Sequence, residues 1–169
     1  SKGKPYLISN DLELARLAHE VNNGTELQMF SQKYFKLTKD IDLSKGLWTP
    51  IGTAQGIAKA SDGHFFAGKF DGDGHSVSNL LIKWSFNTAK EASWGLFARL
   101  NGKGNNENEY AAVTNLIIDN ARIEKLEAHM PLNNANYTVK MGIVVADMTQ
   151  NAELSNITVS YTHLRAHET

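Results

Sequence analysis

The turn Asp71-Gly72-Asp73-Gly74-His75 holds the side chains that could most directly bind a metal ion. Acidic residues that alternate with glycines can supply oxygen ligands to calcium, but an EF-hand loop would also need an acid or amide at position 75 and a later glutamate. The alternative is a tight turn in which the aspartate side chains accept hydrogen bonds from nearby backbone amides while the glycines adopt positive φ. We favour the turn, and we predict neither a metal site nor a cofactor.

Asp40 and Asp42 could do acid–base chemistry, because residues two apart share one face of a strand. Partnered by Asp71 or Asp73, they could form the carboxylate pair of a polysaccharide-degrading hydrolase or lyase. In inverting glycosidases the two carboxyl groups lie roughly 6.5–9.5 Å apart. Exposed strand carboxylates more often only solubilise the surface, and the sequence has no nucleophile elbow, phosphate loop or dinucleotide fingerprint. We therefore expect no catalytic residues and keep the enzyme as the alternative.

Trp84, Phe86 and Trp94 surround a polar stretch and could bind a ligand. Exposed aromatic rings can stack on sugar rings and so form a platform for a glycan. The competing interpretation is that these large side chains seal the core or fix a loop. We take the three aromatics as candidate ligand-binding residues.

Composition narrows the range of partners. The chain has 169 residues, a formal net charge of -1 and no cysteine, so it can form neither a disulfide nor a thiolate metal site. Nucleic acids and anionic membranes call for a basic patch, and none is visible in the sequence. No apolar run approaches the roughly 18 residues needed to span a bilayer. We predict one domain that neither binds nucleic acid nor inserts into a membrane.

A strand, a helix and a second strand are expected within residues 1–44. Residues 6–8 are typical of a short strand, and Asn10 with Glu13 forms a capping-box-like start for a helix. The buried face of that helix is predicted to consist of Leu14, Leu17, Ala18 and Val21. From residue 34 the apolar period changes from 3.6 to 2, which indicates a strand with one buried face.

Two short phrases recur in the rest of the chain, and taken together their asparagine and glycine anchors, at positions 79, 95, 115, 142 and 156, follow one another at steps of 16, 20, 27 and 14 residues. Ser-Asn-Leu-Leu-Ile at 78–82 returns as Thr-Asn-Leu-Ile-Ile at 114–118 and as Ser-Asn-Ile-Thr-Val at 155–159. Gly-Leu-Phe-Ala at 95–98 is echoed by Gly-Ile-Val-Val-Ala at 142–146. Such repeats predict short strands that stack on one another and share a continuous core.

The stacking prediction is specific. Leu80 and Ile82 should lie over Leu116 and Ile118, and these over residues 157 and 159. The asparagine that opens each phrase can hydrogen-bond backbone groups at the corner of the adjacent coil.

These residues resemble the GLUG-motif family of bacterial secreted and cell-surface adhesin-like proteins. The resemblance rests on both repeated phrases and on residues 6–9, 34–43, 48–52 and 68–75. Ala98 stands where the naming motif usually has glycine. The resemblance implies a right-handed parallel β-helix and carries no catalytic residues over to this chain.

We therefore expect an all-β fold, a right-handed parallel β-helix (β-solenoid) with an N-terminal strand–helix cap. Residues 1–44 would form the cap, 45–159 the coils, and 160–169 a non-native tail that resembles a translated adapter sequence. An uncapped last coil would leave an unpaired edge.

The favoured function is that of a non-catalytic surface module of a bacterial adhesin-like protein, which binds a ligand or acts as a spacer. It would contact host glycans, matrix proteins or polysaccharides through loops and one lateral face, and would adjoin further repeats or domains of the same parent chain. The expected location is extracellular or on the bacterial cell surface. A pure spacer with no ligand is the third possibility.

Overall fold

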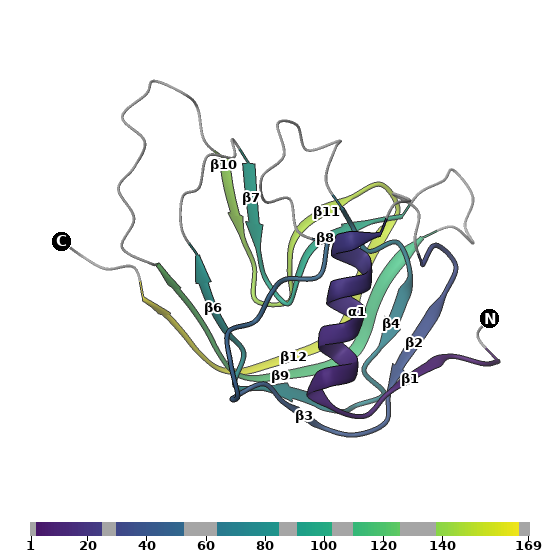
Figure 1. Ribbon diagram of the computed structural model, residues 1–169, viewed down its shortest axis with the longest axis horizontal. Helices are drawn as coiled ribbons and strands as arrows, with labels where there is room; N and C mark the ends of the chain where they lie inside the picture. The colour runs from purple at the N-terminus through teal and green to yellow at the C-terminus, as the bar shows by residue number, and fades with distance from the viewer. Residues whose placement is uncertain are drawn as a thin grey trace.

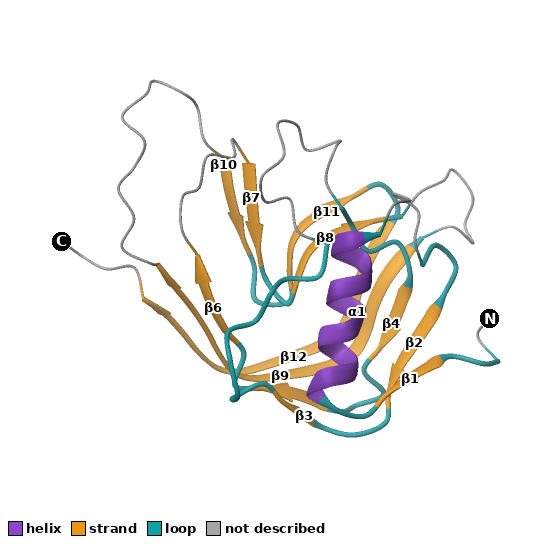
Figure 2. Ribbon diagram, viewed as in Figure 1, coloured by secondary structure: helices purple, strands orange, loops and turns teal. Residues whose placement is uncertain are grey.

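The computed structural model describes residues 3–24, 30–52, 64–84, 91–102, 110–125 and 138–165. In these residues one helix packs against a set of strands, as Figures 1 and 2 show. None of the helical segments described has the length and apolar character needed to cross a bilayer.

The helix α1, Asp11–Asn23, begins where the sequence predicts and for the expected reason. The backbone amide of Glu13 donates to Asn10 Oδ1 at 2.9 Å, and Glu13 Oε2 accepts from the backbone amide of Ser9 at 2.6 Å. This reciprocal pair is a capping box, which satisfies amides that have no partner inside the helix. The predicted buried face is confirmed, because Leu14, Leu17, Ala18 and Val21 are all buried.

The strands form three sheets in which every described pairing is parallel. The eight strands of the main sheet are β1 (Tyr6–Ile8), β2 (Tyr34–Leu37), β3 (Ile41–Asp42), β4 (Lys69–Asp71), β5 (Ser76–Ser78), β6 (Leu81–Trp84), β9 (Ala111–Lys125) and β12 (Ala152–Arg165). The second sheet pairs β7 (Glu91–Trp94) with β10 (Thr138–Met141), and the third pairs β8 (Phe97–Asn101) with β11 (Val145–Thr149).

Strand β9 organises the main sheet. On one side it pairs in succession with β4, β5 and β6, and on the other it pairs with β12 along most of its length. The pairing with β12 continues to Arg165, which is aligned with Glu124, so this strand crosses position 159.

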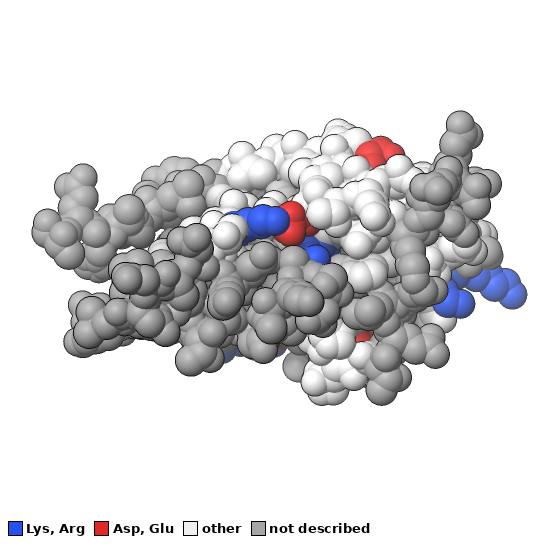
Figure 3. Space-filling model, turned by 90° about the horizontal axis from the view of Figure 1, so that it is seen from above, with Lys and Arg blue, Asp and Glu red and all other residues white. Residues whose placement is uncertain are grey.

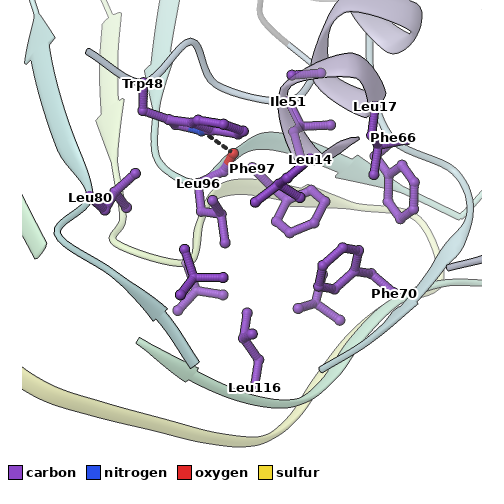
Figure 4. Close-up of a cluster of buried hydrophobic side chains, with 14 of the residues drawn as sticks. Leu14, Leu17, Trp48, Ile51, Phe66, Phe70, Leu80, Leu96, Phe97 and Leu116 are labelled. Carbon is purple, nitrogen blue, oxygen red and sulfur yellow. Dashed lines mark hydrogen bonds between the residues drawn. The ribbon is translucent and has the colours of Figure 1, made fainter. Parts of the chain in front are cut away.

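The expected fold class, an all-β right-handed parallel β-helix, is wrong. The structure is a mixed α/β fold with a mostly parallel main sheet and one helix, and the part of the chain that the structure describes shows no solenoid or β-helix. The physical reason lies in α1, whose apolar face enters the same core as the strands. Figure 4 shows Leu14 and Leu17 directed into one cluster with Phe66, Phe70 and Phe97.

Aromatic rings fill the centre of this core. The rings of Phe66 and Phe97 lie 5.3 Å apart, as do those of Phe70 and Phe97. The indole of Trp48 donates its buried N–H to the carbonyl of Leu96 at 3.0 Å, which satisfies the one polar atom of that side chain (Figure 4). Helix and sheets are thus held by a single hydrophobic cluster.

The stacking prediction is confirmed in one half and wrong in the other. Residues 157 and 159 are aligned with Leu116 and Ile118, as expected. However, Ile82 is aligned with Ile123, and it is Val77 that lies beside Ile118. The first phrase therefore stacks on the later part of β9 and not on the second phrase.

Shortening a buried side chain of the helix should test whether α1 belongs to the core. Leu14→Ala is expected to lower the free energy of unfolding by about 2–5 kcal/mol, because Leu14 is fully buried and its loss leaves a cavity. Leu12→Ala is the matched control on the same helix, since Leu12 is 75% exposed, and should change stability by less than about 0.5 kcal/mol. Equal effects in urea denaturation would contradict a core role for α1.

Candidate functional site

A groove of about 570 Å³ runs over the outer face of the main sheet. We call it the tyrosine groove, after the two tyrosines that flank it. It is lined by Pro5, Tyr34, Phe35, Lys36, Lys69, Phe70, Asp71, Tyr110, Ala112, Thr114, Asn115 and Ser155. These residues come from β2, β4, β9, β12 and the segments before β1 and β9, so the groove crosses several neighbouring strands.

Strand alternation explains why polar side chains gather here. Phe35 and Phe70 point into the core, so the residues on either side of each point outward. Tyr34 on β2 is aligned with Lys69 on β4, and Lys69 is in turn aligned with Ala112 on β9. The small side chain of Ala112 leaves room beside Lys69, and Tyr110 occupies that side of the groove.

Lys69 joins the two tyrosines. Its ammonium nitrogen lies 3.8 Å from the centroid of the Tyr110 ring and 5.1 Å from that of Tyr34, and it donates to the Tyr34 hydroxyl at 3.2 Å. A cation over an aromatic face is attracted by the negative potential of the ring. The Lys69 side chain therefore helps to hold the two rings in place in a groove lined by both polar and apolar residues.

Charged and amide groups complete the groove. Lys36 pairs with Asp73 at 3.0 Å, and Asp71 Oδ1 accepts from Asn115 Nδ2 at 3.0 Å. The Lys36–Asp73 ion pair is exposed and the Asn115–Asp71 hydrogen bond is partly buried, so the ion pair is the more able of the two to exchange partners with water or with a hydroxyl-bearing ligand.

Two rows of stacked side chains, which we call the asparagine ladders, border this face. In the first ladder Asn156 donates to Asn115 Oδ1 at 2.7 Å, and Asn115 donates to Asp71. In the second ladder Asn120 Nδ2 donates to Asn79 Oδ1 at 2.6 Å, and Asn79 Nδ2 donates to Asp42 Oδ1 at 2.8 Å. We expected the asparagines to bond backbone groups; they bond one another instead.

The structure gives each of the four predicted carboxylates a local partner. Asp42 and Asp71 end the two asparagine ladders, and Asp73 pairs with Lys36. Asp40 Oδ1 accepts from the backbone amide of Ser76 at 2.8 Å and lies 3.3 Å from His75 Nδ1. The ladder carboxylates belong to separate ladders, and all four hold the turns in place.

Hydrogen bonds shift the pKa of two of these groups. Donation from the Ser76 backbone amide lowers the pKa of Asp40, with a smaller contribution from His75. Donation from the Asn79 side chain, followed by that from Ser44, lowers the pKa of Asp42. Both carboxylates thus stay ionised to lower pH, which suits hydrogen-bond acceptors better than a general acid.

The turn at residues 71–75 has the local bonding that we favoured at the sequence level. The backbone amide of Asp73 donates to Asp71 Oδ1 at 2.9 Å, and His75 donates its amide to the carbonyl of Gly72 at 2.8 Å. Asp73 and Gly74 have positive φ, whereas Gly72 is needed because a Cβ there would collide with the backbone of Asn115. Within the described ranges, no group of three or more acidic or histidine side chains could hold a metal ion.

The aromatics singled out from the sequence lie elsewhere. Trp94 is buried in the core, Trp84 is partly buried and packs against it, and Phe86 lies outside the described residues. Sequence reasoning missed Tyr34 and Tyr110. Tyr34 stands one position before Phe35 in the alternating strand, so its outward direction could have been found, whereas nothing in the sequence near residue 110 indicates a groove.

Comparison with protein-family models, with curated proteins and with solved structures finds no match to this chain. The resemblance to the GLUG-motif family stays a prediction, and the function has to be argued from the geometry.

Replacing Asn115 should separate its two roles. Asn115→Ala removes the ladder bonds and places a Cβ-bearing residue without a polar side chain at φ 54°, whereas Asn115→Gly removes the same bonds but accepts that φ freely. We expect the alanine variant to be less stable than the glycine variant by about 1 kcal/mol in chemical denaturation. The opposite order would contradict a left-handed corner at this position.

The lowered pKa of Asp42 predicts acid sensitivity. A carboxylate whose folded pKa lies below its ordinary value of 3.8 stabilises the fold fully above that value, and the contribution is lost as pH falls through the folded pKa. The stability advantage of the wild type over Asp42→Asn should therefore shrink as the pH falls below about 5 toward about 2. If the free energies of unfolding of the two proteins differ by the same amount at every pH in this range, Asp42 does not cause the acid sensitivity.

Proposed function

We propose that this chain is a non-catalytic binding module that holds a polysaccharide in the tyrosine groove. An extracellular or bacterial cell-surface location, which the GLUG-motif resemblance implies, is part of this proposal. The observation that carries it is the Tyr34–Lys69–Tyr110 cluster, in which two aromatic rings flank a cation inside a surface groove.

The chemistry of the groove matches that of a sugar chain. Aromatic faces offer apolar contact to the C–H faces of sugar rings, and the tyrosine hydroxyls add polar contacts. Lys69 can donate to sugar hydroxyls, while Asp71 and the Asn115 carbonyl oxygen can accept from them. Because Lys69 already fixes both rings, binding would order few further side chains.

The shape of the site supports binding along a chain. The groove crosses β2, β4, β9 and β12, so a ligand lying in it would contact several strands at once. The carboxylates at its border act as hydrogen-bond acceptors within the fold, which supports a module that binds without cleaving.

The test is a panel of neutral and acidic polysaccharides, with retention measured by affinity electrophoresis and cleavage by new reducing ends. We expect retention without cleavage, and a loss of about tenfold in affinity on Tyr110→Ala, which corresponds to about 1.4 kcal/mol. Tyr110→Phe should retain most of the affinity, because the ring face is kept.

Tyr6→Ala provides the control, since Tyr6 is 54% exposed but lines a different pocket beside α1. It should bind as the wild type does. New reducing ends would overturn the non-catalytic proposal, and a panel without any retained polysaccharide would favour a spacer instead.

A further inference from the structure

The β7–β10 and β8–β11 pairs diverge from a common bend (Figure 1), and each pair carries aligned polar residues. On the first pair Ser93 is aligned with Lys140, and on the second Arg99 is aligned with Asp147. Basic and acidic side chains also adjoin in the middle of the face that Figure 3 shows. We call Ser93, Arg99, Lys140 and Asp147 the bend cluster; none of them belongs to the tyrosine groove.

The carboxylate of Asp147 lies closer to Lys140 than to Arg99. Lys140 Nζ lies 2.9 Å from Asp147 Oδ2, which is a charge-assisted hydrogen bond between the two sheets. Arg99 Nε lies 3.7 Å from the same oxygen, too far for a hydrogen bond. Among the described side chains, two positive charges therefore share the one negative charge of Asp147, and Arg99 is the cation whose contact with it is too long for a hydrogen bond.

Arg99 has a buried hydrogen-bond donor without an acceptor. Its side chain is only 8% exposed, and its buried Nη1 has no hydrogen-bond partner. A buried N–H group without a partner is rare in native proteins, and it is most costly on a charged side chain. Nη1 has no acceptor in the described part of the structure, and Asn101 Oδ1 on the same strand is a second buried polar atom without a hydrogen-bond partner there.

We propose that the bend cluster binds the carboxylate group of a ligand. One carboxylate would neutralise the excess positive charge beside Lys140, and the Arg99 guanidinium, whose Nη1 is buried as the fold stands, would have to turn toward it to donate. Lys140 is 41% exposed and marks the solvent side of the cluster, so the ligand enters beside it. The carboxylate can come from a small organic acid or from a uronic acid unit of a saccharide.

The experiment titrates the folded chain with acetate, with glucuronate and with glucose as the uncharged analogue, at constant ionic strength. Binding is followed by the NMR signal of the Arg99 Nε–H group, identified by its loss in Arg99→Lys. We expect acetate and glucuronate to shift this signal saturably and glucose to leave it unchanged. Thermal melts confirm that each variant is folded.

Lys140→Gln is the test variant, because its partly exposed side chain can change without opening the core. It should weaken carboxylate binding by about tenfold or more. Lys45→Gln is the matched control, since Lys45 also pairs with a carboxylate, that of Asp11 at 3.0 Å, but lies outside the cluster.

A response to glucuronate alone would support the site and assign it to an acidic saccharide. No saturable shift with either acid, an equal shift with glucose, or unchanged affinity in Lys140→Gln would each overturn the proposal. These outcomes are independent of the tyrosine groove, because Tyr110→Ala leaves the bend cluster intact.

Discussion

The left-handed corners of the main sheet are the constraint on which the rest of the structure depends. Asn79, Asn115, Asn120 and Asn156 all have φ between 51° and 57°, a conformation that most L residues avoid. Asparagine tolerates it, and here the amides also bond one another across neighbouring strands. A slip of one residue would break these bonds and turn the buried face of each strand outward. The asparagine ladders thus hold the register that builds both the core and the tyrosine groove.

Local elements could be predicted because their causes are local. The capping box at Asn10 and Glu13 and the apolar face of α1 are set by residues within a few positions of each other. The glycine phrases at 95–98 and 142–146 do lie side by side, since Leu96 donates its backbone amide to the carbonyl of Ile143. Short-range spacing and repetition were sufficient for these features.

Long-range pairing could not be predicted, and the site depends on it. Strand β9 has two corners, at Asn115 and Asn120, so a repeated Ser-Asn phrase has two places to stack. The first phrase stacks on the corner at Asn120. The residues after Asn120 are Ala121 and Arg122, so this corner does not look like a copy of the Asn-Leu phrase in the sequence. The fold class was missed because the helix was assigned to a cap, although its apolar face enters the core. Tyr110 joins the groove through the pairing of β4 with the start of β9, in which Lys69 is aligned with Ala112.

The bend between the second and third sheets is formed by a direct contact of two backbones and not by an asparagine ladder. The charged residues Arg99, Lys140 and Asp147 lie on the strands that leave this bend. A Cβ on Gly95 would collide with the carbonyl oxygen of Gly142, so the two backbones meet directly at the bend. In addition to this backbone contact, the ion pair of Lys140 with Asp147 adds a side-chain link between the sheets. A buried ion pair such as Arg99 with Asp147 contributes little net stability, because desolvation offsets the attraction. The proposed ligand would give the charge of the buried guanidinium a partner that Asp147 alone does not provide.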